Sequence, residues 1–381
     1  MSQVKKDIGV YIHVPFCKSK CFYCDFNSYA CAESSIPEYF SAVKKEMGLY
    51  TDSLKELEIG TVFIGGGTPS YVAPEYLNET LNLLRTYGHI QAEAEISIET
   101  NPGTLSYDKL AAYRDMGINR LSIGLQAWQE PILKSIGRIH SRGEFLENYR
   151  QARKAGFENI NVDLIFGLPG QTLAQWEETI HQVLSLQPEH ISCYSLKVEE
   201  GTLFGERLEA GELKMIEDEL DREMYYLAVE KLKKAGLKHY EISNFARPGY
   251  ECRHNLIYWK AEEYIGIGAG AHSYFDENRY SSYNDIKDYV EQLKNGLLPQ
   301  ENKEFISKTE SISEYIILGL RLIKGVRSSD FQARYNEDLF HLYKETIGKL
   351  QGRGLLQADE KGIRLTPKGL DLANEVMAEF I

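Results

Sequence analysis

The chain has 381 residues, enough for two domains or for one large domain with an appendage. Hydrophobic residues make up 43% of it, and the formal net charge of −13 argues against a nucleic-acid partner, which needs a concentrated basic face. No apolar run approaches the ~18 residues that span a bilayer and no apolar leader begins the chain, so we expect a cytoplasmic protein without a transmembrane segment.

Strand-like and helix-like segments alternate from residue 7 to about residue 200. Short runs rich in Ile, Val, Leu and Tyr predict strands, and longer amphipathic segments between them predict helices. This alternation predicts an α/β fold whose parallel strands are joined by right-handed crossovers, and six such units predict a partial (β/α)6 barrel. The predicted strands are Gly9–Val14, Thr61–Ile64, Glu95–Glu99, Arg120–Leu125, Asn161–Phe166 and His190–Lys197. The predicted helices are Pro37–Tyr50, Pro74–Tyr87, Tyr107–Met116, Arg142–Ala155 and Leu173–Leu186.

The pattern changes after Lys197. Helices are predicted over Ile216–Ala235 and Asp285–Asn295, with less regular segments around residues 239–245, 254–259 and 266–273. From Thr309 onward the predicted elements are the helices Ser313–Lys324, Ser329–Tyr335, Leu339–Arg353 and Pro367–Phe380, with a small hairpin before the last one. This outline is winged-helix-like, but residues 309–381 hold ten Lys+Arg against eleven Asp+Glu, which favours a structural or partner-docking role over DNA binding. We therefore predict domains at 1–240 and 309–381, with a connecting segment at 241–308.

The spacing C-x3-C-x2-C of Cys17, Cys21 and Cys24 predicts a metal cluster. A structural zinc site needs four protein ligands, and a cubane iron–sulfur cluster takes one thiolate on each of four irons. Three cysteines therefore leave one iron open to another ligand. Half of a zinc ribbon and a disulfide framework are the alternatives, and both are weak because the remaining cysteines are scattered. These are Cys31, Cys193 and Cys252.

Polar residues follow the predicted strands at their carboxyl ends, where active groups gather in barrels of parallel strands. The glycines before Thr68 form either a tight turn or a place where backbone approaches a ligand. Glu99 either caps the Asn-Pro-Gly turn after it or accepts hydroxyl groups of a ligand. Asp163 lies among apolar residues and needs a partner, for which Arg138 is a candidate. The strand-end features are the cysteine loop, Gly65–Pro69, Glu99, Gln126, Asp163 and Lys197.

The cysteine spacing resembles that of the radical S-adenosylmethionine (SAM) superfamily. Further segments are similar to the oxygen-independent coproporphyrinogen III oxidase family, and the similarity covers nearly the whole chain. These segments are Tyr11–Cys17, Ile64–Ser70, Ile98–Pro102, Ser122–Gln126 and Val162–Gly170. The resemblance implies a [4Fe-4S] cluster on Cys17, Cys21 and Cys24, with SAM on the open iron. It implies Tyr11, Gly66 and Glu99 at that SAM, and a second SAM position at Tyr23, Gly67, Thr68, Gln126, Arg138, Asp163 and Lys197.

Two departures from the oxidases resemble the haem chaperone (HemW-type) branch of the family. The oxidases continue the motif with a fourth cysteine, where this chain has Phe26, and they carry a longer N-terminal extension. The branch also has a His-Asn-x-x-Tyr-Trp element, which implies haem at His254, Asn255, Tyr258 and Trp259. From the residues alone, the alternative is that His254 and Asn255 cap a turn while the aromatic pair packs in the core. Cys252 and, more weakly, His272 are further candidates for the haem ligand.

The sequence thus predicts a haem chaperone that hands haem to an acceptor protein and uses an electron donor, neither of which it identifies. The alternative is an oxidase that decarboxylates coproporphyrinogen III, which the residue at position 26 disfavours. A radical enzyme that acts on tRNA or on a small molecule is a more distant alternative, which the acidic charge and the motifs of the porphyrin family disfavour. No residue is assigned a catalytic role.

Overall fold

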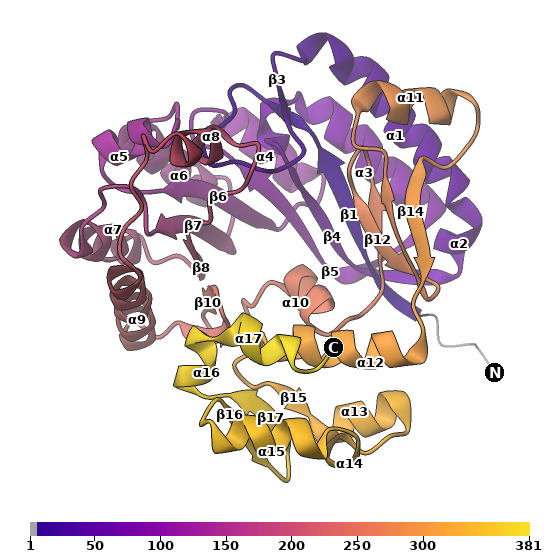
Figure 1. Ribbon diagram of the computed structural model, residues 1–381. Helices are drawn as coiled ribbons and strands as arrows, with labels where there is room; N and C mark the ends of the chain where they lie inside the picture. Colours follow the sequence, from indigo (N-terminus) through magenta and orange to yellow (C-terminus); the bar gives the residue numbers. More distant parts are fainter. Residues whose placement is uncertain (1–5) are drawn as a thin grey trace.

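The computed structural model describes residues 6–381 and contains one mixed sheet of 12 strands (Figure 1). The strand order is β14 (Gln300–Phe305), β13 (Asn278–Ser282), β12 (His272–Phe275), β11 (Tyr264–Ile267), β1 (Lys6–Val14), β4 (Leu57–Gly66), β5 (His89–Thr100), β6 (Arg120–Gln126), β7 (Ile160–Phe166), β8 (His190–Ser195), β10 (Asn244–Ala246) and β9 (Lys238–Glu241). The strands from β11 to β8 are parallel, and antiparallel strands extend the sheet at both ends. Among the described residues β14 and β9 do not pair with each other, so the barrel is open.

The predicted alternation of strands and helices is confirmed. The six predicted strands are β1, β4, β5, β6, β7 and β8, and a helix lies in each of the five crossovers between them. Strands such as β6 and β7 are buried along nearly their whole length, as parallel strands covered on both faces should be. The crossover helices are α1 (Ile36–Leu49), α2 (Thr51–Lys55), α3 (Pro74–Tyr87), α4 (Tyr107–Asp115), α5 (Glu130–Ser135), α6 (Arg142–Lys154) and α7 (Leu173–Ser185).

One parallel strand was missed by the sequence prediction. Strand β11 has four residues and pairs with β1 from Gly9↔Tyr264 to Ile12↔Ile267. A strand this short shows no period of its own, and Gly266 and Gly268 weaken its local signal. Pairing with the completed β1 therefore decides its conformation.

Short elements complete this part of the chain. The strands β2 (Phe16–Cys17) and β3 (Tyr29–Ala30) pair with each other and bracket the cysteine loop. Helix α10 (Arg253–Trp259) lies between the sheet and the C-terminal helices (Figure 1). The remaining elements are the 3-10 turns η1 (Glu33–Ser35) and η2 (Pro69–Tyr71) and the helices α8 (Leu203–Glu209), α9 (Asp218–Lys234), α10 (Arg253–Trp259) and α11 (Ile286–Lys294).

The C-terminal region is helical and has its own hydrophobic core, which includes Phe331, Leu350 and Phe380. Two helices predicted as continuous are each interrupted, one at Tyr343, where the ring packs against Phe380, and one at Leu372. The predicted division at 240/241 and 308/309 stays a prediction. The elements are α12 (Lys308–Gly319), β15 (Val326–Arg327), α13 (Ser328–Tyr335), α14 (Leu339–Leu342), α15 (Lys344–Gly352), β16 (Leu356–Asp359), β17 (Gly362–Leu365), α16 (Pro367–Asp371) and α17 (Ala373–Ala378), with the strands in the order β15-β17-β16.

No helix in residues 6–381 is long and apolar enough to cross a membrane.

A buried carboxyl group joins α1 to the segment after β11. Glu46 accepts hydrogen bonds from the Gly268 amide (2.8 Å) and from the hydroxyl of Tyr289 (2.5 Å). Ser282 donates a third, at 3.3 Å. Burial raises the pKa of Glu46 to about 7, because the three donors offset only part of the desolvation cost.

This shift predicts a pH-dependent contribution to stability. When folding raises the pKa of a carboxyl group, the free energy of unfolding falls as the pH rises from the pKa of the unfolded state, near 4.5, through the folded pKa of about 7. We expect the free energy of unfolding of Glu46→Gln to rise by about 3 kcal/mol relative to that of the wild type over this pH interval, because a neutral amide has no proton to lose. Urea unfolding of both proteins from pH 4.5 to 8 measures this difference. A difference that stays constant with pH contradicts the assignment.

Candidate cluster and cofactor site

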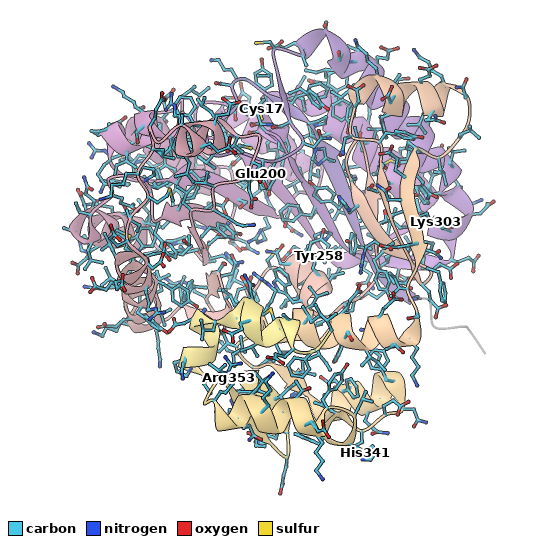
Figure 2. The ribbon with its side chains drawn as sticks, viewed as in Figure 1. Cys17, Glu200, Tyr258, Lys303, His341 and Arg353 are labelled. Carbon is cyan, nitrogen blue, oxygen red and sulfur yellow. The ribbon has the colours of Figure 1, made fainter. Side chains whose placement is uncertain are left out.

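The three cysteines of the motif line one cavity of about 440 Å³ at the carboxyl ends of the parallel strands. Cys17 is buried at the end of β2, and Cys21 and Cys24 are half-buried in the loop that follows. Figure 2 shows Cys17 above the sheet, on the side away from the C-terminal helices. All three are free thiols, so they are available as ligands.

Backbone pairing holds the cysteine loop against the glycine run after β4. Val14 pairs with Gly66 across the parallel strands, and the Gly67 amide then donates to the Val14 carbonyl at 2.9 Å. The Thr68 amide donates to the Phe16 carbonyl at 2.8 Å. A Cβ atom at residue 67 would lie 3.0 Å from Phe16 backbone atoms, which explains why glycine stands there.

A polar network joins two of the cysteines through Asn101, a residue to which the sequence analysis assigned no role. Thr68 Oγ1 lies 3.2 Å from Cys17 Sγ and accepts a hydrogen bond from Asn101 Nδ2 at 2.9 Å. Arg138 donates to Asn101 Oδ1 at 2.7 Å and to Cys21 Sγ at 3.4 Å. Only the position of Asn101 directly after a strand end signalled this contact in the sequence.

The donor set fits a cluster that needs thiolates. Burial raises the pKa of Cys17 and of Cys24, so both favour the thiol form when no metal is present. At Cys17 the hydrogen bonds with Thr68 and Ser28, and then the charge of Arg138, act in the opposite direction and favour the thiolate. The buried Nε of Arg138 has no partner among the described residues, which leaves a donor at the cavity wall.

A single bound ion is a poor fit to the same residues. In residues 6–381 no three His, Cys, Asp or Glu side chains converge to hold one metal ion. A cubane differs, because each of its cysteines binds a different iron and the sulfur atoms need not meet at one point.

The structure brings together most of the residues expected at SAM. Gly66 and Glu99 border the cysteine cavity as well as a second one, whereas Tyr11 lines only the second. The residues expected at a second SAM position all line the cysteine cavity. They are Tyr23, Gly67, Thr68, Gln126, Arg138, Asp163 and Lys197.

Glu99 accepts a hydrogen bond from the Gly66 amide at 3.0 Å rather than capping the turn after β5. Burial, followed by the charge of Asp163, raises its pKa to about 8. A ligand that donates hydroxyl groups to this carboxylate would compensate part of that cost. Gly66 has φ +111°, and a Cβ there would lie 2.5 Å from the His13 ring, so substitutions at Gly66 disturb the fold.

The expected pair between Asp163 and Arg138 is not formed. Ser122 and Asn161 donate to the two oxygens of Asp163 at 2.7 and 2.8 Å, and Arg138 binds other acceptors. Neutral donors therefore satisfy this carboxylate, and the Asp163 side chain still lines the cavity. Gln126, at the end of β6, has φ +71°, which is uncommon for a non-glycine residue and occurs often at ligand sites.

The second cavity, of about 840 Å³, lies between the sheet, α10 and α12. Tyr258 and Trp259 line it, and the buried indole Nε1 of Trp259 has no partner among the described residues. It shares Phe26, Gly66 and Glu99 with the cysteine cavity, so the two adjoin. Figure 2 shows Tyr258 on α10 between the sheet and the C-terminal helices.

His254 does not line this cavity. Its Nδ1 lies 2.7 Å from Thr61 Oγ1 and its Nε2 lies 2.8 Å from the Tyr258 hydroxyl, so both ring nitrogens are engaged. Burial lowers the pKa of His254 to about 3, which keeps the imidazole neutral. Asn255 lines neither cavity, and burial raises the pKa of Cys252 to about 12 and keeps it a thiol. The exposed imidazole of His272 does line the cavity.

His13 is a further site residue that the sequence analysis did not assign. Its Nε2 donates to the Asn27 carbonyl at 2.8 Å, which leaves Nδ1 to accept from the Tyr11 hydroxyl at 2.9 Å. Burial lowers the pKa of His13 to about 4, so this neutral tautomer holds the end of the cysteine loop.

Comparisons with known proteins agree with this geometry. The chain matches the family model "Radical SAM superfamily" at residues 11–183 and the model "HemN C-terminal domain" at residues 306–372. The solved structure of coproporphyrinogen III oxidase (HemN) from Escherichia coli covers 99% of this chain and 90% of its own, with a TM-score of 0.86 at 23% identity. The fold is thus the TIM-like barrel of the radical SAM superfamily with a helical C-terminal region, as predicted.

The sequence relatives define the family more closely. Heme chaperone HemW of Bacillus subtilis is 38% identical over 374 residues, covering 98% of this chain and 99% of that protein. Heme chaperone HemW of Lactococcus lactis is 35% identical, covering 99% and 98%. A mitochondrial radical S-adenosyl methionine domain-containing protein 1 of Bos taurus is 31% identical, covering 98% and 87%. The chain belongs to the HemW family.

We expect Cys17→Ala, Cys21→Ala and Cys24→Ala each to abolish the iron–sulfur cluster, because in a cubane each thiolate would hold a different iron. Anaerobic reconstitution of the wild type should give about four irons and four sulfides per chain. The exposed Cys31 supplies the control, since Cys31→Ala should retain full iron content. Full iron content in any one of the three variants contradicts the ligand set.

Glu99→Ala should weaken SAM binding by about tenfold or more, because a hydrogen bond between the Glu99 carboxyl group and a ligand hydroxyl is lost. Within residues 6–381 Glu99 accepts a single hydrogen bond, from the Gly66 amide, so the variant should fold. The matched control is Glu93→Ala, which changes an exposed residue on the same strand. Calorimetry with the reconstituted protein measures the affinities. Equal affinities in the two variants contradict a contact between Glu99 and SAM.

Proposed function

We propose that this protein is a haem chaperone, which binds haem in the cavity beside α10 and transfers it to an acceptor protein. The cavity of about 840 Å³ lined by Tyr258 and Trp259 is the observation that carries this proposal. Its volume suits a macrocycle, since ligand cavities run from about 300 to 1,000 Å³. The names of the HemW relatives, which cover nearly the full length of the chain, point to the same cargo.

His254 lies behind Tyr258 and reaches haem in this cavity only if the Tyr258 side chain moves. The Tyr258 hydroxyl occupies the Nε2 side of the imidazole, and the Tyr258 side chain lines the cavity. Rotation of that one side chain exposes a neutral imidazole, which binds iron without first losing a proton. Thr61 holds the other ring nitrogen and fixes the ring orientation, as an outer partner does for a metal-binding histidine.

The cysteine cavity would hold a [4Fe-4S] cluster with SAM beside the haem cavity. Such a pair supplies one-electron reductive cleavage of the SAM sulfonium when it is bound and an electron donor is present. The residues of this chain do the positioning: Asn101 and Arg138 set the cysteine loop, and Glu99 and Gly66 face both cavities. Phe26, 60% exposed, also lines both of them.

Haem binding tests the proposal. We expect the wild type to bind about one haem per chain with a protein-type Soret band, and His254→Ala to lose or shift that band. Tyr258→Phe should bind haem more tightly, because it leaves Nε2 of His254 free. His181→Ala, at an exposed position on α7, is the control. A normal band in His254→Ala and its loss in His272→Ala would move the ligand to His272.

The same preparation separates a chaperone from an oxidase. With SAM and reductant under anaerobic conditions, it should not decarboxylate coproporphyrinogen III, since Phe26 stands at the position of the oxidase cysteine. Robust conversion to protoporphyrinogen IX overturns the chaperone proposal.

A further inference from the structure

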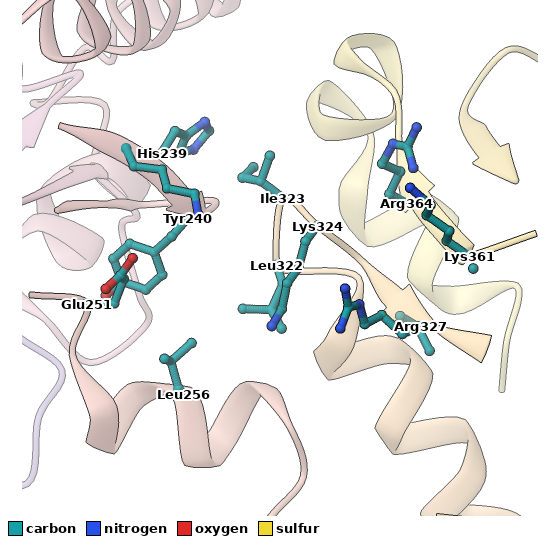
Figure 3. A pocket seen from close by; sticks show the side chains of 13 residues that line it. His239, Tyr240, Glu251, Leu256, Leu322, Ile323, Lys324, Arg327, Lys361 and Arg364 are labelled. Atoms are coloured by element: carbon teal, nitrogen blue, oxygen red, sulfur yellow. The ribbon is translucent and has the colours of Figure 1, made fainter. Parts of the chain in front are cut away.

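A third cavity, of about 510 Å³, lies between the end of the sheet and the C-terminal region (Figure 3). The sheet contributes Lys238, His239 and Tyr240 from the last strand, β9, and α10 contributes Leu256. The segment around β15 and the turn before β17 form the opposite wall. The apolar part of the lining comes from Tyr240, Leu256, Leu322, Ile323 and Val326.

Cations outnumber anions at this cavity. Its lining contains one carboxylate, Glu251, which accepts a hydrogen bond from the Gly249 amide at 2.9 Å. Of the lining cations, Arg364 is paired with Asp359 at 3.0 Å, and in the described part of the chain no ion pair engages the other four. The lining cations are Lys238, Lys324, Arg327, Lys361 and Arg364.

The charges at the cavity repel one another. Burial, followed by the cations Lys260 and Arg327, lowers the pKa of Lys324, and Asp330 offsets only part of this. Unpaired like charges at a concave, partly apolar surface attract counter-ions more strongly than the same charges on a convex one. On a chain with a net charge of −13, this cluster is a local exception.

We propose that this cavity binds a small ligand with at least two carboxylate or phosphate groups beside an apolar body. Lys238 comes from the sheet, whereas Arg327 and Lys361 come from the C-terminal region, so two anionic groups would bridge the two walls. Arg327 is suited to bidentate binding of either group. The cavity volume lies within the ordinary range for small-molecule sites. The propionates of a porphyrin and free oligophosphates share this chemistry, and the site does not depend on the haem proposal.

Two probes and one double variant test the site. The probes are inorganic pyrophosphate, and a metal-free porphyrin dicarboxylate with its dimethyl ester as the uncharged comparison. The variant Lys324→Ala/Arg327→Ala removes two exposed cations and should fold. The control Lys287→Ala/Lys303→Ala removes the same charge from exposed positions outside the cavity. Calorimetry should show binding of at least one probe that is weakened about tenfold or more in the variant and unchanged in the control.

The pattern of results identifies the source of the anionic groups. If the double variant weakens the binding of pyrophosphate alone, the ligand carries phosphate groups. If the double variant lowers the affinity for the porphyrin dicarboxylate to that of its dimethyl ester, the ligand is a porphyrin. Equal binding of both probes to variant and control, or no binding of either to the wild type, overturns the proposed site. The haem chaperone proposal fails separately. In that case the wild type binds no haem, while the result of the pyrophosphate titration is unaffected.

Discussion

The structure depends on the parallel pairing of β1 with β4. This pairing places Val14 beside Gly66, and the next two amides, of Gly67 and Thr68, then bond to carbonyls before the cysteine loop. These bonds join backbone to backbone, so the close approach at Gly67 leaves no room for a side chain there. The cysteines, the glycine run and the carboxyl ends of the next strands meet at one cavity for this reason.

Titratable groups with shifted pKa values lie at this cavity and on α10. Glu99, half-buried beside the glycine run, has its pKa raised to about 8, and Arg138 lies between Asn101 and a cysteine. Residues with perturbed pKa values gather at functional sites because a bound ligand repays the cost of burying them. His254 is the opposite case, since it is buried, neutral and hydrogen-bonded on both nitrogens. Its hydrogen bond to Thr61 ties α10 to β4.

Helix α10 contacts both the sheet and the C-terminal region, which the sequence analysis predicted as separate domains. Glu95, on β5, accepts the backbone N–H groups of Arg253 and His254 and so holds the first turn of the helix. The far end of the helix carries Tyr258 and Trp259, and Arg321 from the C-terminal region stacks over the Trp259 ring at 4.3 Å. Helix α10 therefore connects the sheet to the C-terminal region and also borders the cavity of about 840 Å³.

The sequence by itself determined the alternating α/β pattern, the three-cysteine motif and the family resemblance, because these are encoded in local spacing. It also placed Gly67, Thr68 and Asp163 near the cysteines, since the carboxyl ends of parallel strands share one edge. Only the tertiary structure decided the partners. Asp163 bonds to Ser122 and Asn161 instead of Arg138, and β11 becomes a strand by pairing with β1. Ser122 lies 41 positions from Asp163, and β11 lies far from β1 in the chain, so packing rather than any local period brings these partners together.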